Sequence, residues 1–187
     1  MVTKVPYRFV DWDEPFDVYV KHLQQFVLST NILNTGTFLN PFKAADVFTA
    51  IPSLQKLLEK YSLNDLRSVA IIKALPSHVA QNYPHVDVTP SSDHNIALNW
   101  PVFNCEETFT CFYKPKPGAQ PELLQLRNGL NYSRYQFDMV EETHRIKIQK
   151  PVALRVDMLH SVINDTQDVR VSASFRFNTN HWELFNG

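Results

Sequence analysis

The first third of the chain repeats apolar residues at the spacing of amphipathic helices. Apolar positions three and four residues apart predict a helix over residues 16–28. A second helical pattern starts at Asn40-Pro41, where asparagine suits the cap and proline suits the first turn, and it continues to Tyr61. Pro52 lies inside this second pattern, so we expect the helix to split or kink there. Both helices should pack on the outside of a sheet.

After about Leu66 the chain changes to short stretches of apolar, β-branched and aromatic residues separated by turn-forming residues. The predicted strands are residues 68–75, 85–88, 95–103, 108–113, 133–137, 144–148, 152–157, 161–164 and 169–177. Residues 118–132 give no clear pattern, and we interpret them as an excursion over one face. Many short strands with turns between them predict a mainly β protein with flanking helices, built as a sandwich or jelly roll.

Length and composition limit the possible classes of protein. With 187 residues the chain can form a single domain, in which residues 1–65 should be a helical support for a β core over residues 66–180. The net charge of −1, with no basic block, argues against a broad surface for nucleic acid or an anionic membrane. Only four glycines are present, and we find neither a P-loop nor a dinucleotide-binding motif.

The sequence also indicates a compartment. No apolar run approaches the roughly 20 residues that a membrane-spanning helix needs, and the first residues do not form a signal-peptide pattern. The two cysteines, Cys105 and Cys111, are too few for a disulfide framework. We therefore expect a cytoplasmic protein in a reducing environment.

A short triplet, His85-Val86-Asp87, is the first candidate for chemistry. Successive side chains of an extended strand point to opposite faces, so His85 and Asp87 project the same way and could bind one metal ion. The alternative interpretation is a surface histidine beside an aspartate that caps the next turn. His94 lies in the polar loop that follows and is a rival ligand.

His160 is the candidate for a third ligand. It lies in an otherwise apolar run between two predicted strands, where an unpaired imidazole would be poorly solvated. It could instead be a core histidine that is bonded to a backbone carbonyl. Two imidazoles and one carboxylate with open positions opposite are the usual ligands of non-haem Fe(II) that must bind a co-substrate and dioxygen.

Arg170 and Ser172 follow His160 and share one face of the last predicted strand. Arginine has a rigid fork that can bind a carboxylate at two points, and a serine hydroxyl can add a further hydrogen bond. The alternative is that Arg170 pairs with a local carboxylate, Asp165 or Asp168. Arg176 falls on the same face and is a rival for the same role.

His85-x-Asp87, a distant His160 and then Arg170-x-Ser172, in this order and in a strand-rich context, resemble the Fe(II)- and 2-oxoglutarate-dependent oxygenase superfamily. The resemblance implies a double-stranded β-helix (a cupin-like jelly roll) with N-terminal helices packed on one sheet. It also implies His85, Asp87 and His160 as iron ligands, and Arg170 with Ser172 as the binding site for the distal carboxylate of 2-oxoglutarate. Polar residues on predicted central strands are further candidates to line the co-substrate pocket, among them Asn99 and Thr110.

The activity that this resemblance implies is a dioxygenase, a hydroxylase, that converts 2-oxoglutarate to succinate and carbon dioxide. Its substrate would be a small molecule or a peptide, because the near-neutral charge disfavours nucleic acid. Two alternatives stay open: a jelly-roll binding or scaffold protein without turnover, and a cupin-type metal enzyme that does not use 2-oxoglutarate. The usual cupin signature, two histidines one residue apart followed by a glutamate, is absent from the sequence.

Overall fold

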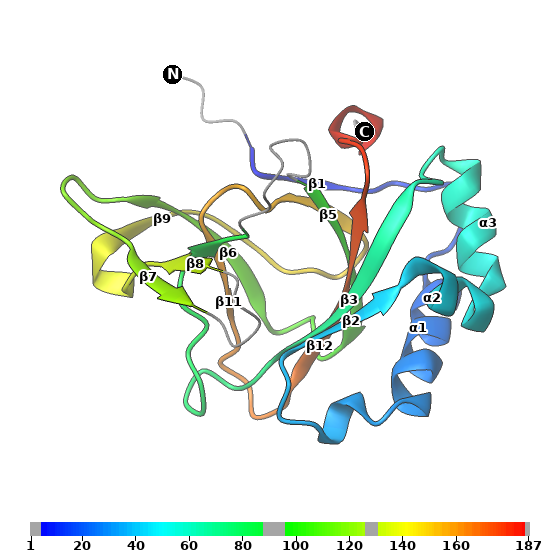
Figure 1. Ribbon diagram of the computed structural model, residues 1–187, viewed down its shortest axis with the longest axis horizontal. Coiled ribbons are helices and arrows are strands. Elements are labelled where there is room, and N and C mark those ends of the chain that lie inside the picture. Colours follow the sequence, from blue (N-terminus) through cyan, green and yellow to red (C-terminus); the bar gives the residue numbers. More distant parts are fainter. Residues whose placement is uncertain (1–4, 88–95, 126–130, 186–187) are drawn as a thin grey trace.

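A computed structural model describes residues 5–87, 96–125 and 131–185 of the chain. These residues form two antiparallel β-sheets that face each other, and helices cover the outer side of one sheet (Figure 1). The sheet beneath the helices, the major sheet, has the order β1 (Tyr7–Phe9), β10 (Val152–Arg155), β5 (Ile96–Phe103), β12 (Arg170–Phe177), β3 (Leu66–Ala74), β2 (Leu39–Lys43). The minor sheet has the order β7 (Glu122–Gln125), β8 (Asn131–Arg134), β4 (His85–Val86), β11 (His160–Ile163), β6 (Phe109–Pro115), β9 (Val140–Ile146).

The helices belong to the N-terminal third of the chain. They are α1 (Asp17–Ser29), α2 (Ala44–Ala50) and α3 (Pro52–Lys60), and short 3-10 helices occur at η1 (Ile32–Asn34), η2 (Phe137–Met139) and η3 (Trp182–Phe185). Leu23 of α1 and Leu54 of α3 are fully buried and pack in one cluster with Trp100 of β5. The helices therefore stabilise the outer face of the major sheet by burying apolar surface.

Alternation along β12 gives its two faces different surroundings. The side chains that join the core beneath the helices are Val171, Ala173, Phe175 and Phe177. The intervening side chains face the minor sheet, and these are Arg170, Ser172, Ser174 and Arg176. The central strand of the major sheet thus buries an apolar face on one side and presents a polar face to the space between the sheets.

The space between the sheets is itself divided. On the side of β10 and β9 it is filled by a separate apolar cluster that includes Phe112, Ile146, Val152 and Leu154. On the side of β3 and β4 the inner-face positions include the polar side chains of β12 and His85. A hydrophobic half therefore supports a polar half, in which a site can form.

Most of the predicted elements are confirmed. The helix over residues 16–28 is α1, and the predicted break at Pro52 separates α2 from α3. Every predicted strand corresponds to an observed one, with boundaries that differ by a few residues: β3, β4, β5, β6, β8, β9, β10, β11 and β12. Residue 88 of the second predicted strand lies outside the described residues.

The prediction of a helix start at Asn40-Pro41 was wrong. These residues belong to β2, which pairs antiparallel with β3 and places Pro41 opposite Ala70. Proline is tolerated there because β2 is an edge strand, so one side of its backbone needs no ladder hydrogen bonds. The N-terminal segment also supplies β1, so residues 1–65 contribute two strands to the major sheet as well as the helices.

None of the helices in the described part of the chain is long and apolar enough to cross a membrane.

Two leucines of α1 test the packing of the helices on the major sheet. Leu23 is fully buried, whereas the side chain of Leu28 on the same helix is 63% exposed. We expect Leu23→Ala to lower the free energy of unfolding by about 2–5 kcal/mol, because it removes buried methyl groups and leaves a cavity. Leu28→Ala should change it by no more than about 0.5 kcal/mol. Urea denaturation followed by circular dichroism measures both, and equal losses would contradict the assigned packing.

Candidate metal centre

The pairing of β4 with β11 brings the two predicted histidines together. His85 and His160 are direct partners in this antiparallel pair, and the centroids of their rings lie 4.7 Å apart. Asp87 follows β4 directly, and its backbone N–H donates to the carbonyl of Val156 at 3.0 Å. One potential ligand atom from each of His85, Asp87 and His160 lies within 4.8 Å of the others. A triplet and a residue far downstream therefore form one cluster.

Backbone carbonyls fix the orientation of both imidazole rings. Nδ1 of His85 lies 2.8 Å from the carbonyl oxygen of Tyr83, and Nδ1 of His160 lies 2.8 Å from that of Met158. A carbonyl can only accept, so each Nδ1 donates and each Nε2 is left with a lone pair when the ring is neutral. This arrangement, in which the second ring nitrogen bonds a carbonyl, is typical of metal-binding histidines.

The Asp87 carboxylate lies between a ligand candidate and a cation. Its Oδ1 is 3.4 Å from Nε2 of His85, and its Oδ2 accepts a hydrogen bond of 2.5 Å from Nη2 of Arg176. Burial alone would raise the pKa of the Asp87 carboxyl, but the adjacent His85 imidazole and the charge of Arg176 lower it well below its usual range. Asp87 is therefore ionised at neutral pH and has one oxygen directed toward His85.

His160 has the protonation state that a metal ligand needs. Its side chain is only 8% exposed, and burial lowers the pKa of the imidazole to about 4, although the negative charge of Asp87 opposes this shift. The ring is therefore neutral at pH 7. Neutral imidazole nitrogen and ionised carboxylate oxygen form a donor set that fits Fe(II).

A tight turn after β10 supports two of the three side chains. Val156 bonds the backbone of Asp87, and Met158 bonds the ring of His160, in both cases through a backbone carbonyl. A two-point ion pair, Arg155 Nε to Asp157 Oδ1 at 2.8 Å and Nη2 to Oδ2 at 2.5 Å, braces this turn. The sequence analysis did not identify these supporting residues, because no motif marks them.

Arg170 lies across from the cluster, on the inner face of β12. Its side chain is 3% exposed, its Nη2 lies 3.4 Å from Oγ1 of Thr110, and its Nε has no hydrogen-bond partner. Within the described part of the chain Arg170 forms no ion pair, and Asp165 and Asp168, the local partners considered above, are exposed. A buried guanidinium without an anion is unfavourable, so the structure leaves a place that suits a carboxylate.

The neighbours of Arg170 add unsatisfied polar atoms. Ser172 is 3% exposed, and Asn99 of β5 is 8% exposed with an unpartnered Oδ1. Ser174 lies directly opposite Asn99, and its hydroxyl is likewise without a partner. Four residues predicted for the co-substrate pocket, namely Arg170, Ser172, Asn99 and Thr110, therefore lie on inner faces around the same space, and Ser174 joins them.

Arg176 has a different position from the one considered in the sequence analysis. It is on the same face of β12 as Arg170, as expected, but its guanidinium binds Asp87. Alternation revealed the shared face, but only the arrangement of β12 opposite β4 distinguishes the two arginines. The rival ligand His94 lies outside the described residues.

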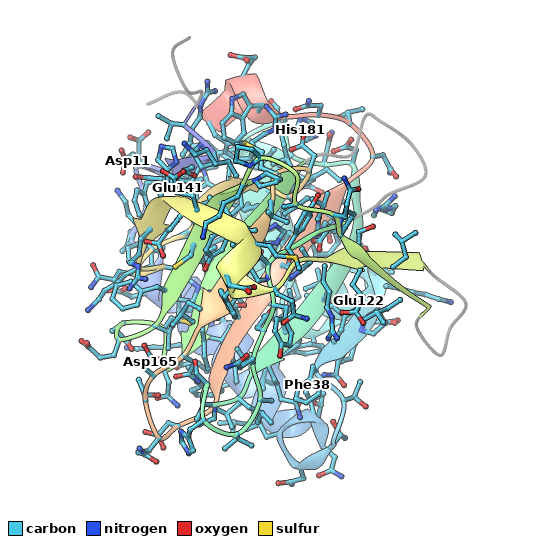
Figure 2. The ribbon with its side chains drawn as sticks, turned by 90° about the vertical axis from the view of Figure 1, so that its left-hand side faces the viewer. Asp11, Phe38, Glu122, Glu141, Asp165 and His181 are labelled. Carbon is cyan, nitrogen blue, oxygen red and sulfur yellow. The ribbon has the colours of Figure 1, made fainter. Side chains whose placement is uncertain are left out.

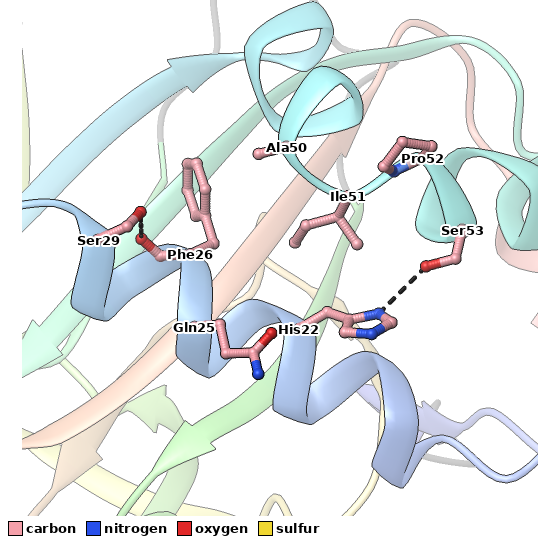
Figure 3. Close-up of a pocket in the computed structure, with 8 residues that line it drawn as sticks. All are labelled: His22, Gln25, Phe26, Ser29, Ala50, Ile51, Pro52 and Ser53. Atoms are coloured by element: carbon pink, nitrogen blue, oxygen red, sulfur yellow. Dashed lines mark hydrogen bonds between the residues drawn. The ribbon is translucent and has the colours of Figure 1, made fainter.

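One cavity among the helices is separate from these residues. It has a volume of about 420 Å³ and lies beside α1 and the junction of α2 with α3 (Figure 3). Within it Nδ1 of His22 lies 3.1 Å from the hydroxyl of Ser53. Among its described lining residues there is none predicted for the metal or co-substrate site, and none is a carboxylate that would complete a catalytic triad with this pair.

Comparisons with known proteins identify the fold. No protein-family model and no curated protein matches the sequence. The solved structure of SnoK, a non-heme alpha ketoglutarate dependent carbocyclase from nogalamycin biosynthesis, matches with a TM-score of 0.55 and 9% identity over 92% of this chain and 79% of SnoK. The epimerase SnoN, solved with Fe³⁺, alpha ketoglutarate and nogalamycin RO, matches with a TM-score of 0.51 and 11% identity over 97% of this chain and 84% of SnoN.

HygX from Streptomyces hygroscopicus, solved with nickel and 2-oxoglutarate, matches with a TM-score of 0.50 and 11% identity over 92% of this chain and 80% of HygX. The chain therefore has the jelly-roll, double-stranded β-helix fold that 2-oxoglutarate oxygenases share, with helices packed on one sheet. The predicted fold class and the resemblance in fold are confirmed.

The lowered pKa of His160 predicts how the stability of the metal-free protein depends on pH. An unfolded histidine titrates near about 6.5, whereas His160 titrates at about 4 in the folded protein. Between these values the unfolded state takes up the proton first, so stability should fall as the pH drops through this window, by about 3 kcal/mol in total. Urea denaturation at several pH values measures this loss.

His160→Gln should remove this part of the pH dependence, because glutamine does not titrate. The control is His78→Gln at an exposed position, which should retain the wild-type dependence. Identical pH profiles for the wild type and His160→Gln would contradict a buried, neutral His160.

Proposed function

We propose that this protein is an Fe(II)- and 2-oxoglutarate-dependent dioxygenase that hydroxylates a small molecule or a peptide. One observation supports this proposal above the others. A cluster of His85, Asp87 and His160 on the minor sheet faces a buried Arg170 on the major sheet that has no anion of its own. A dicarboxylate that binds a metal at one end and a guanidinium at the other would satisfy both.

In this proposal His85, Asp87 and His160 hold the iron. Their carbonyl partners, Tyr83 and Met158, keep the rings oriented with Nε2 available as a ligand. When iron and 2-oxoglutarate are bound, the metal supplies the activation of dioxygen, and the protein orients the reactants and excludes water. The arrangement is that of a donor set with open positions for a co-substrate.

Arg176 has a positioning role in this proposal. Its ion pair with Asp87 keeps the carboxylate ionised and holds Oδ2, which leaves Oδ1 for the metal. Because Arg176 comes from the major sheet and Asp87 from the minor sheet, this pair also fixes the separation of the two sheets at the site. A fixed separation matters, since a co-substrate must reach the metal and Arg170 together.

Arg170 would bind the distal carboxylate of 2-oxoglutarate, with hydroxyl groups of Ser172 and Thr110 as further donors. The fork of the guanidinium suits a carboxylate at two points. SnoN and HygX are solved with 2-oxoglutarate, which supports the use of the same co-substrate here. SnoK and SnoN are a carbocyclase and an epimerase, so hydroxylation is the outcome that we propose among several compatible with the fold.

Anaerobic titration tests the metal and co-substrate sites. Addition of 2-oxoglutarate to the protein loaded with Fe(II) should give the weak visible band of metal-to-ligand charge transfer. Asp87→Ala should abolish the band, because it removes the carboxylate ligand and leaves Arg176 uncompensated. His22→Ala, on α1, is the control and should leave the band unchanged. A well-folded wild-type protein without the band would argue strongly against the proposal.

Succinate formation in the presence of oxygen tests the role of Arg170. Arg170→Ala should raise the 2-oxoglutarate concentration needed for half-maximal turnover by about 100-fold or more, since a buried charge pair is lost. Arg67→Ala, which removes an exposed arginine of β3, should have no such effect. Equal turnover in Arg170→Ala and wild type would remove the assigned role.

The anaerobic titration, the succinate assay and a measurement of oxygen consumption together separate the alternatives. A charge-transfer band without succinate formation would indicate a binding protein, and oxygen consumption without any 2-oxoglutarate would indicate a cupin-type enzyme.

A further inference from the structure

A row of paired residues crosses the inner face of the minor sheet. His160 of β11 pairs with His85 of β4, His85 pairs with Arg134 of β8, and Arg134 pairs with Glu122 of β7. Residues that are directly paired in antiparallel strands lie on the same face of the sheet. Arg134 and Glu122 therefore continue the face that presents the two histidines. Since strands lie about 4.8 Å apart, Arg134 stands roughly one strand spacing from His85 and two from His160.

Described residues on the inner faces of the edge strands β2 and β7 are exposed to solvent. The inner-face positions of β2, which are Leu39, Pro41 and Lys43, are all exposed, whereas Phe42 on the other face packs against the helical core. Glu122 is exposed as well, and it lies on the same side of the molecule as Phe38, which precedes β2 (Figure 2). We call this side, between β2 and β7, the open edge. It contrasts with the opposite side of the sandwich, which is filled by the cluster around Phe112 and Leu154.

Arg134 is held in place at the open edge. The carbon of its guanidinium lies 4.6 Å from the ring centroid of Tyr83, and its Nε donates to Oε2 of Glu122 at 2.9 Å. Tyr83 is also the residue whose carbonyl accepts from the ring of His85. The same residue therefore positions a metal-ligand candidate and the arginine beside it, so the relative placement of the two is fixed by short contacts.

We propose that Arg134 anchors a carboxylate of the substrate, and that the substrate is a small organic acid. This inference rests on the function proposed above. The planar guanidinium fork suits a carboxylate at two points. The pair with Glu122, whose side chain is 46% exposed, is of the kind that contributes little stability, so a substrate carboxylate can replace Glu122 at small cost.

The separation between Arg134 and the histidines that would hold the metal indicates the size of the substrate. The backbones of His85 and His160 lie one and two strand spacings from that of Arg134, roughly 5 and 10 Å. This distance suits a molecule of the size of an amino acid or an aromatic acid, with the reacting C–H bond a few bonds from the carboxylate. A long polymer is not needed to span it.

The experiment uses the protein loaded with Mn(II), under saturating 2-oxoglutarate, so that Arg170 is occupied and no turnover occurs. The probes are butyrate, benzoate, phenylacetate and N-acetylglycine, each with its primary amide, and phenyl phosphate. Paramagnetic relaxation of the probe protons in NMR reports whether a probe lies near the metal, and titration gives its Kd. Relaxation of the 2-oxoglutarate protons is measured first, and its absence would mean that the proposed function fails rather than the substrate assignment.

We expect at least one carboxylate to show relaxation that its amide lacks. Arg134→Gln should raise the Kd of that carboxylate by about 10- to 100-fold, because the guanidinium fork is lost. Arg134→Lys keeps the charge without the fork, so its Kd for the carboxylate should lie between those of the wild type and Arg134→Gln. The matched control is Arg145→Gln. Arg145 also pairs with a glutamate through Nε and lies over an aromatic ring. It is paired with Cys111, however, so it lies on the outer face of the minor sheet, away from the histidines. It should leave the affinity and the 2-oxoglutarate relaxation unchanged.

Glu122→Gln separates a binding role of Arg134 from a structural one. If Glu122 only occupies the guanidinium until substrate arrives, its removal should tighten carboxylate binding by up to about fivefold. If the pair is merely structural, the affinity should not rise. The proposal is overturned if no carboxylate relaxes, if amides relax equally, if phenyl phosphate is preferred, or if Arg134→Gln binds carboxylates like the wild type.

Discussion

The alternation of β12 is the constraint on which the rest of the structure depends. One face of this strand is buried beneath the helices, and the other presents Arg170 and Arg176 to the minor sheet. A shift of one residue in its register with β3 would place both guanidinium groups in the apolar core, at a large cost in free energy. The packing of α1 and α3 therefore specifies the polar face as firmly as it specifies the core.

The two arginines of this face differ in how their charge is compensated. Arg176 has a carboxylate partner in Asp87, and the pair links the two sheets. Arg170 has Thr110 as its contact and, among the described residues, no carboxylate. A buried, uncompensated charge destabilises a folded protein. The proposed binding of a carboxylate at Arg170 would supply the missing anion and so explain why a residue of this kind is buried here.

The sequence was sufficient for elements whose signal is local. The helix α1, the break at Pro52 and the strands of the β core other than β7 follow from apolar spacing and turn residues; β7 lies in the segment interpreted as an excursion. The strand β2 was missed because Asn40-Pro41 is also a good helix start, and pairing with β3 decides between the two. The cluster of His85 and His160 was expected from the order of residues, but their pairing across β4 and β11 could not be, because register is a property of two strands.

The sequence alone also could not distinguish the positions of Arg170 and Arg176. Alternation places it with Arg170 on one face, and both are arginines, so the sequence gives equal reason to choose either. Only the position of Asp87 opposite the end of β12 assigns them different roles.

The chain shares its fold with SnoK and SnoN at only 9–11% identity. This fits a structure in which the packing of the core and the polar inner face place different demands on the sequence. The apolar faces need only residues of suitable size and pattern, which many sequences supply. The chemistry needs a few inner-face positions, and these lie near the centres of the sheets. The edges are free to differ, and in the proposals above the selection of a substrate falls to strands such as β7 and β8 rather than to the fold. In this chain the row from His160 through His85 to Arg134 joins the two regions.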